Sequence, residues 1–403
     1  MLSETKIDKY SDVLWWALKT ARKGTFRKGD IVLVRYNLAA LKLAETLQAK
    51  LLDRGMHPVL RLGMTPVMER QFYLKANNNQ LVFHPPGEKT LYRNLNGSIY
   101  LHAPDSLTHL AVVEPRKIAK AMIAGKPFRD ILDKREAQGA FGWSLCLFPT
   151  LALTIGARLS KRQYANQVIR ACYLDKKDPV GEWKRIYRNA MAIKKWINSM
   201  DVKTLHIESQ NTDLQIQPGS NRRWIGISGH NIPSFEIFLS PDWRGTEGVY
   251  YADQPSFRSG NYVEGVRLTF KKGTVVNVEA EQGELFLKRT LTTDMGASRV
   301  GEFSLTDRRF SRINCFMANT LYDENYGGRQ GNCHIALGSS YSNTYSGDAK
   351  KLNQSLKQKL GFNESALHWD LVNTEKKRVA AHLKSGDALV IYENGQFTYE
   401  PGR

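Results

Sequence analysis

The character of the chain changes near residue 200, and this change constrains the fold more than any other feature of the sequence. Before it, helix patterns alternate with short apolar runs: helix 6–23, strand 30–36, helix 38–54 with its C-cap Gly55, strand 57–62, strand 143–150 and a long helical region 160–200. Such alternation is typical of a parallel sheet with right-handed crossovers. We therefore predict an N-terminal α/β domain with a parallel sheet over residues 1–200.

Beyond residue 200 the pattern becomes one of short strands separated by turns, among them the glycine turn at Gly273. The predicted strands cover 205–207, 214–217, 224–227, 266–270 and 275–278. Because 403 residues exceed what one hydrophobic core usually serves, a second domain is expected. We predict a strand-rich α+β domain over residues 201–403.

Several classes of protein are excluded by what the sequence lacks. It has no run of eighteen apolar residues, and its first ten residues contain no apolar segment, so we expect neither a membrane span nor a secretory signal. The four cysteines, Cys146, Cys172, Cys315 and Cys333, include no CxxC pair and suggest no disulfide framework. We predict a cytoplasmic protein. A P-loop, an HExxH motif and a GxSxG motif are absent, and no GxGxxG follows the first strand.

The charge of the chain is strongly basic, with 58 Lys and Arg against 39 Asp and Glu and a formal net charge of +19. Such a field attracts nucleic acid and acidic peptides without specificity, but a solvated surface also carries such charge. Aromatic residues interleave with basic ones at 183–187 and 194–196, a spacing that also fits a helix with its aromatics facing a core. A basic nucleic-acid-binding α/β protein therefore remains an alternative, and we favour the solvated surface.

The most informative site pattern is Leu367-His368-Trp369-Asp370-Leu371. In a strand, residues two apart point to the same face. His368 and Asp370 therefore share one face, while the apolar residues share the other. Imidazole and carboxylate groups that converge in one place are the ligands that divalent metals use for hydrolysis.

Five further candidate residues lie in turn-rich surroundings of the second half: Glu236, Glu302, Glu324, His334 and Tyr341. Glu302 is a single charge inside an apolar run, and a buried carboxylate without a partner is costly. His334 opens another apolar run, and Tyr341 returns to the same place if the turn at 338–340 folds back. These residues extend the possible ligand set beyond the strand at 368–370.

Structural roles are open for the same residues. Glu302 has Arg299 and Arg308 as available ion-pair partners, and a lone histidine is more often a satisfied or exposed residue than a ligand. Cys333 stands beside His334, but neighbours in a strand diverge to opposite faces, so we interpret Cys333 as core packing. Tyr341 has the simpler interpretation of an aromatic residue in a turn. The residues alone leave a metal site and these structural roles both open.

Five stretches of the chain, taken together, resemble the thermophilic metalloaminopeptidase family of the aminopeptidase T and aminopeptidase S type. They are 231–238 (NIPSFEIF), 266–276 (VRLTFKKGTVV), 300–305 (VGEFSL), 319–325 (NTLYDEN) and 333–341 (CHIALGSSY). They occur in the order of the family and with nearly its spacing. The resemblance extends over the whole chain and is most specific between residues 210 and 371.

The resemblance implies a metal-dependent aminopeptidase that acts on peptides with a free N-terminus and forms a homodimer. It implies two divalent metal ions (zinc, cobalt, manganese or magnesium) with the ligands Glu236, Glu302, Glu324, His334, His368 and Asp370. It further implies that Glu302 bridges the ions and that Tyr341 is the catalytic side chain.

Two departures from the family concern substrate range and metal affinity. Phe235 stands where the family has a second glutamate, and the loop 326–332 is extended. A catalytically inactive relative that binds metal is therefore kept as an alternative.

Overall fold

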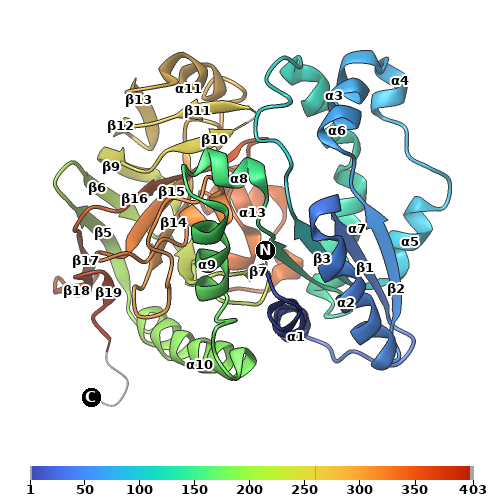
Figure 1. The fold of residues 1–403 in the computed structure, drawn as a ribbon. Helices are drawn as coiled ribbons and strands as arrows, with labels where there is room; N and C mark the ends of the chain where they lie inside the picture. The colour runs from blue at the N-terminus through green and yellow to red at the C-terminus, as the bar shows by residue number, and fades with distance from the viewer. Residues whose placement is uncertain (1, 259, 400–403) are drawn as a thin grey trace. The chain divides into compact units, whose positions relative to one another are not determined.

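The computed structural model describes residues 2–258 and 260–399 (Figure 1). The chain forms two compact units, Met1–Trp183 with Ser228–Pro233 and Lys184–Ile227 with Ser234–Arg403. The division into domains at residue 200 stays a prediction. Within the described ranges, every helix is too short or too polar to cross a lipid bilayer.

The N-terminal unit is built on a parallel five-stranded sheet with the order β2-β1-β3-β4-β7. The strands are β1 (Ile31–Tyr36), β2 (His57–Leu62), β3 (Leu95–His102), β4 (Gly142–Leu147) and β7 (Asn231–Ile232). The helices are α1 (Glu4–Ala21), α2 (Leu41–Asp53), α3 (Pro66–Lys75), α4 (Asn78–Leu81), α5 (Glu88–Asn94), α6 (Pro115–Ala124), α7 (Lys126–Ala137), α8 (Leu151–Gly156) and α9 (Lys161–Ala171). This arrangement confirms the predicted parallel α/β architecture.

Helices cover both faces of this sheet because its strands are apolar on both sides. A Cβ at Gly97 would lie 3.1 Å from the side chain of Leu18, so α1 approaches the face that carries Gly97 and its register partner Val32. The opposite face carries Leu33, against which Leu91 of α5 and Leu132 of α7 pack.

Two of the predicted elements are wrong in detail. The helical region 160–200 is two helices, because α10 (Pro179–Asn198) starts anew at Pro179, where the Asp178 side chain accepts a hydrogen bond from Gly181 N at 2.9 Å. The strand predicted at 224–227 is a single bridge between Ile225 and Phe238. Gly226 there has φ of +127°, so the backbone leaves the extended conformation.

The C-terminal unit is rich in strands, as predicted, and these strands pair in the antiparallel sense. Its eight-stranded sheet has the order β13-β12-β9-β6-β5-β17-β18-β19, and a four-stranded sheet has the order β16-β15-β14-β8. The larger sheet contains β5 (Val202–Glu208), β6 (Asp213–Gln217), β9 (Asp242–Ala252), β12 (Val266–Lys271), β13 (Thr274–Glu279), β17 (Arg378–Leu383), β18 (Ala388–Glu393) and β19 (Gln396–Phe397). The smaller contains β8 (Glu236–Leu239), β14 (Val300–Thr306), β15 (Asn332–Gly338) and β16 (His368–Asn373).

Short elements complete this unit: the hairpin β10 (Ser256–Arg258) and β11 (Asn261–Val263), and the helices α11 (Glu284–Thr290), α12 (Thr320–Asp323) and α13 (Gln354–Lys359). Buried tyrosines of the large sheet join the two sheets. Tyr250 of β9 donates a hydrogen bond to Leu371 O at 2.7 Å, and Tyr392 of β18 donates one to Thr306 O at 2.7 Å. The four-stranded sheet therefore has one face fixed against the large sheet, and its other face carries the polar side chains.

Candidate metal centre

The register of the four-stranded sheet brings residues from distant parts of the sequence onto one face. Ala336 of β15 pairs with Glu302 on one side and with Asp370 on the other. Because alanine is small, the two carboxylates extend over the central strand from either side. Gly338 of the same strand pairs with His368, and a Cβ there would lie 2.1 Å from Leu367 O, so glycine allows the close approach of the two strands just before His368. Short residues on β15 thus allow side chains of β14 and β16 to meet.

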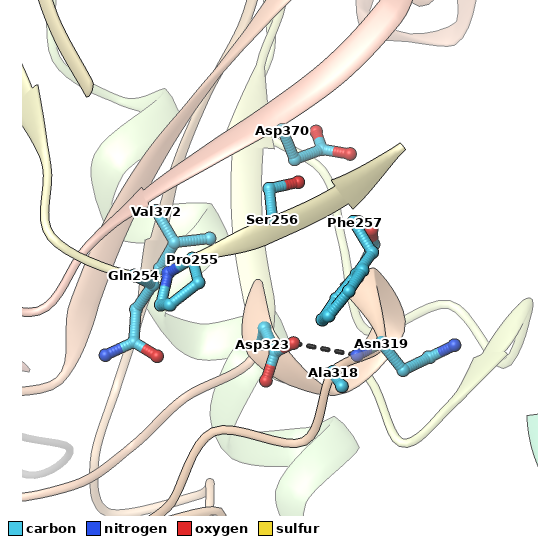
Figure 2. A pocket seen from close by; sticks show the side chains of 10 residues that line it. Gln254, Pro255, Ser256, Phe257, Ala318, Asn319, Asp323, Asp370 and Val372 are labelled. Atoms are coloured by element: carbon cyan, nitrogen blue, oxygen red, sulfur yellow. Dashed lines mark hydrogen bonds between the residues drawn. The ribbon is translucent and has the colours of Figure 1, made fainter. Parts of the chain in front are cut away.

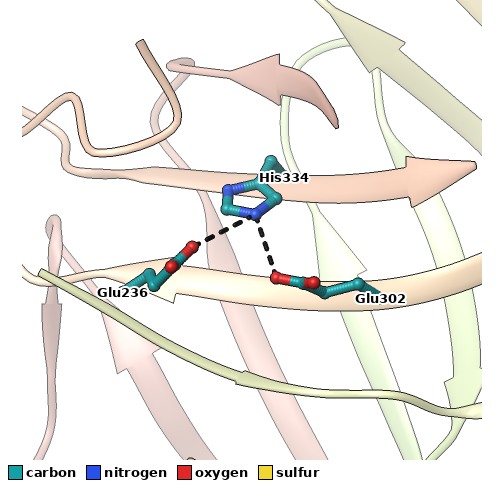
Figure 3. Close-up of side chains that lie close together, drawn as sticks. All are labelled: Glu236, Glu302 and His334. Atoms are coloured by element: carbon teal, nitrogen blue, oxygen red, sulfur yellow. Dashed lines mark hydrogen bonds and ion pairs between the residues drawn. The ribbon is translucent and has the colours of Figure 1, made fainter. Parts of the chain in front are cut away.

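The central strand itself contributes His334, and the edge strand β8 contributes Glu236. Figure 3 shows both glutamates directed at the imidazole, with His334 Nε2 lying 3.3 Å from Glu302 Oε1 and 3.6 Å from Glu236 Oε2. On the other side, His368 Nε2 lies 3.4 Å from Asp370 Oδ1 and 3.7 Å from Glu302 Oε2. These residues form two groups of three potential ligands, in each of which the ligand atoms lie within 4.8 Å of one another. Glu236, Glu302 and His334 form one group and Glu302, His368 and Asp370 the other, so Glu302 belongs to both.

Two glycines allow the backbone to reach these positions. A Cβ at Gly301 would lie 2.3 Å from Gly338 O, at the point where the register of β14 shifts just before Glu302. A Cβ at Gly226 would lie 2.0 Å from Glu236 O, so the chain passes closely over the first residue of β8. Side chains at either position would displace a strand that carries a glutamate of the cluster.

Burial and like charge disfavour ionisation of two of the carboxylates. Burial, followed by the charge of Glu302, raises the pKa of Glu236 to about 8. Burial also raises the pKa of Glu324 well above its usual range, with further contributions from Glu236 and Asp370. Such crowding of buried oxygen ligands is what a divalent cation relieves, and oxygen and imidazole donors suit zinc, manganese and related ions. The residues present therefore fit the metal that the resemblance implies.

Asp370 and His368 behave as an ion pair. Burial opposes ionisation of Asp370, but the imidazolium of His368 outweighs it and lowers the carboxyl pKa to about 2. Burial likewise opposes the charged form of His368, yet Asp370 and Glu302 raise its pKa to about 9. The pair is charged at neutral pH, and His368 must lose a proton before its nitrogen can bind a cation.

Glu324 and Tyr341 lie beside the two groups and belong to neither. Glu324 follows α12, is 7% exposed, and is electrostatically coupled to the clustered carboxylates. The ring of Tyr341 lies 4.8 Å from that of His368, so the turn at 338–340 does fold back. Tyr341 is 43% exposed, but burial of its hydroxyl and the nearby carboxylates raise its pKa well above the usual range. The hydroxyl therefore keeps its proton and is a hydrogen-bond donor.

The structural alternatives for Glu302 and Cys333 have clear outcomes. Arg299 lies over the ring of Trp243 at 3.8 Å, and Arg308 donates to Arg329 O, so Glu302 pairs with neither arginine. Cys333 is fully buried, and burial raises the pKa of its thiol to about 11. Such a thiol remains protonated at neutral pH and is a poor nucleophile, as its interpretation as core packing requires.

Sequence reasoning missed Asn325, which connects two of the predicted ligands. Its Oδ1 accepts a hydrogen bond from Phe235 N at 2.5 Å, next to Glu236, and its Nδ2 donates to Leu321 O at 3.0 Å. The same Nδ2 lies 3.4 Å from Glu324 Oε1. Asn325 is completely buried, so these bonds are shielded from water. The asparagine follows the two acids in the sequence, but nothing local indicates that it reaches β8.

Asp323 was missed as well. Its carboxylate accepts hydrogen bonds from Met317 N at 2.7 Å and Asn319 N at 2.8 Å, and burial raises its pKa to about 8. Asp323 lines a cavity of about 20 Å³ that Asp370 also lines. Figure 2 shows both side chains together with Ser256 and Phe257, which line the same cavity. Asp323 thus shapes the loop that borders the cluster.

The basic and aromatic segment that suggested nucleic-acid binding has structural contacts in each unit. Trp183 is 1% exposed and stacks on Trp16 at 5.8 Å. Lys194 donates a hydrogen bond to Gly226 O at 2.6 Å, and burial lowers its pKa to about 8. These two residues are therefore not available as a stacking surface for bases.

Known proteins resemble this chain throughout its length. Aminopeptidase PepS of Streptococcus thermophilus is 25% identical in an alignment of 398 residues that covers 92% of this chain and 93% of PepS. Aminopeptidase T of Thermus aquaticus is 29% identical in an alignment of 268 residues that covers 64% of this chain and 63% of that protein. The solved structure of wild-type AmpT from Thermus thermophilus has the same fold, with a TM-score of 0.80 at 22% identity over 97% of this chain and 99% of that one. A model of the family described as thermophilic metalloprotease (M29) matches residues 3–397. The chain therefore belongs to the thermophilic metalloprotease family, which confirms the predicted family and, with it, the class of enzyme, a hydrolase of peptide bonds.

Proposed function

We propose that the cluster on β8, β14, β15 and β16 binds two divalent metal ions and that the protein is an aminopeptidase. One observation carries the proposal: the two oxygens of Glu302 face different ligand groups. Glu302 Oε1 lies 3.3 Å from His334 Nε2, and Glu302 Oε2 lies 3.7 Å from His368 Nε2. A carboxylate between two imidazoles in this way is suited to bridge two cations.

In this proposal Glu236, Glu302 and His334 hold one ion, and Glu302, His368 and Asp370 hold the other, as the two groups of three suggest. Glu324 completes the set, because it is buried and electrostatically coupled to the same carboxylates. Ions held there would supply Lewis acidity, which makes water a stronger nucleophile and a peptide carbonyl a better electrophile. Which of zinc, cobalt, manganese or magnesium is bound is a question for elemental analysis.

Two side chains have proposed roles in proton and charge handling. Tyr341 keeps its proton because its pKa is raised, so its hydroxyl can donate a hydrogen bond to the oxygen that gains negative charge during attack on the carbonyl. Whichever of Glu324 and Glu236 is not fully engaged by metal can carry a proton to the leaving amine. The substrates in this proposal are peptides with a free N-terminus, in line with the aminopeptidase names of the relatives.

The decisive experiment compares Glu302→Gln and His334→Ala with the unaltered protein, using leucine p-nitroanilide as substrate and elemental analysis for bound metal. Both variants should lose hydrolysis and metal together, because each removes a ligand. His382→Ala is the matched control, since this exposed imidazole lies on β17 outside the cluster. Unchanged turnover in either ligand variant would refute the site.

The same measurements separate the remaining alternatives. A metal-binding relative without activity would hold metal but turn over no substrate with zinc, cobalt or manganese added. A nucleic-acid-binding protein would bind single strands in a salt-dependent way and hold no metal. We also propose a homodimer, as the resemblance implies, and light scattering of the purified chain tests its mass in solution. The proposed cytoplasmic location rests on the pattern of the cysteines.

A further inference from the structure

A large cavity lies within the N-terminal unit, among residues that the metal centre does not use. It has a volume of about 800 Å³, which falls in the range of roughly 300–1,000 Å³ that small-molecule sites occupy. Its floor is the sheet face that carries Leu33 and Ser98, and its walls include α5 and α7. We call it the basic pocket, because Arg35, Arg61 and Arg129 line it.

The pocket lies where ligands usually bind to a sheet of this type. The order β2-β1-β3-β4-β7 reverses direction between β1 and β3, and open α/β sheets bind ligands near the carboxyl ends of the strands at such a reversal. Arg35 and Arg61 are the penultimate residues of β1 and β2 and are partners in register. Two guanidinium groups therefore lie on the same face at the correct end of the sheet.

The positive charge of the pocket is only partly neutralised. Glu88 binds Arg61 through two hydrogen bonds of 2.5 and 2.8 Å, so this pair is internally balanced. Arg35 lies over the ring of Tyr100 at 5.2 Å, and within residues 2–258 and 260–399 no carboxylate forms an ion pair with it.

The third arginine, Arg129, donates to Met122 O at 3.3 Å; among the described residues no carboxylate forms an ion pair with it within 4.0 Å, although its charge acts on Asp133, one turn further along α7. Glu69 is the carboxylate whose charge raises the pKa of Tyr100, and it is already in contact with His109, whose Nε2 lies 2.8 Å from Glu69 Oε2. The pocket therefore presents two guanidinium groups that an incoming anion can bind, and guanidinium binds carboxylate and phosphate through paired hydrogen bonds.

An aromatic wall stands beside these charges. The centroid of the Phe128 ring lies 4.5 Å from that of His84 and 5.1 Å from that of Tyr92, and both contacts have edge-to-face geometry. Leu91 and Leu132 continue this wall down to the floor. Apolar walls with a few charged groups are the usual composition of a pocket that binds a ring-bearing ligand.

We propose that the basic pocket binds a small anion that carries an aromatic or apolar ring, through Arg35 and Arg129 for the charge and the Phe128 wall for the ring. The anionic group is a carboxylate or a phosphate, since guanidinium recognises both. The proposal does not depend on the metal centre.

The test is calorimetric titration of the full chain with phenyl phosphate and with N-acetyl-L-phenylalanine, which separate the two anion chemistries. The uncharged N-acetyl-L-phenylalanine amide is the neutral probe. The combined variant Arg35→Gln, Arg129→Gln removes both of the arginine charges that have no ion-pair partner. Arg93→Gln is the matched control, because Arg93 is an exposed arginine of α5 that does not line the pocket. The variant Glu302→Gln, which should lose its bound metal, shows whether a probe binds at the metal centre instead of in the basic pocket.

We expect at least one anion to bind the unaltered protein, Arg93→Gln and Glu302→Gln alike, and to bind the double variant at least about tenfold more weakly. Preference for one probe identifies the anionic group. Four results would each overturn the proposal: neither anion binds, the double variant binds normally, Glu302→Gln abolishes binding, or the neutral amide binds as well as the acids.

Discussion

Loading the metal centre at pH 7 should release at least about two protons per chain. Metal ligands must be deprotonated to bind. Glu236 has a pKa of about 8, chiefly because it is buried, and His368 has a pKa of about 9 because Asp370 and Glu302 outweigh the effect of burial. Both side chains therefore hold a proton at pH 7 in the metal-free protein, and both protons must leave when a cation arrives.

The magnitude follows from the two pKa values. At pH 7 a group with a pKa of 8 is ~90% protonated and one with a pKa of 9 is ~99% protonated, so their sum is about 1.9 protons. Glu324 and His334 belong to the same proposed ligand set, and because the pKa of each is raised, they add further protons to this number. Below pH 7 both Glu236 and His368 are protonated in the metal-free protein. The apparent affinity for the metal should therefore increase at least about a hundredfold for each unit by which the pH increases.

The assay is titration of the chelator-stripped protein with zinc at pH 7 in buffers of different ionisation enthalpy, which counts released protons directly. Glu236→Gln should lower the count by about one, because the variant has no carboxyl proton at that position. His382→Ala, on the exposed face of β17, should leave the count unchanged. Release of clearly less than one proton, or an affinity that does not change between pH 6 and pH 7, would refute the reasoning.

Three further predictions concern stability and individual residues. The metal-free protein should melt at a lower temperature at pH 9 than at pH 6, and added zinc should reduce the difference between the two melting temperatures. Because their pKa values are raised in the fold, Glu236 stabilises it fully below about pH 4.5 and His368 below about pH 6.5, and this stability is lost as the pH rises through about 8 for Glu236 and about 9 for His368. A melting temperature of the metal-free protein that increases with pH would contradict this prediction. Tyr341→Phe should lose turnover and keep its metal, and a parallel fall in metal content would exclude the donor role. Asn325→Ala should lower the free energy of unfolding by about 1–3 kcal/mol in denaturant titration, because the buried Phe235 N–H loses its acceptor. It should also weaken zinc binding, and an unchanged zinc affinity would show that Asn325 does not position Glu236.

The regular elements were predictable where local pattern decides them. The helix spacing of Tyr10, Val13, Leu14 and Leu18 indicated α1, and these residues are buried. The strand predicted at 224–227 failed because the path of the chain there is set by a distant segment. Gly226 adopts φ of +127° beside Glu236 O, where a Cβ would lie only 2.0 Å from that oxygen, and hydrophobic periodicity contains no information about this close approach.

The candidate site shows the same division between local and distant determinants. The alternation at His368 and Asp370 is a local pattern, and the structure has both side chains on one face of β16. The approach of Glu302 to Asp370 depends on β14 and β16 flanking β15, with Ala336 between them. That neighbourhood is a property of sheet order, for which the sequence offered only a family resemblance. Asn325 escaped notice for the same reason.

The apolar core and the metal centre are specified by one alternating pattern. Along β16, Trp369 and Leu371 are 2% and 1% exposed, while His368 and Asp370 face the cluster. A shift of one residue in the register would reverse both faces together, burying charge in the core and exposing the tryptophan. The energy of core burial therefore holds the carboxylates in a buried cluster, where burial first and the charge of Glu302 second raise the pKa of Glu236. A cation relieves this repulsion only at the register that the core already favours, so the core positions the ligands before any metal is bound.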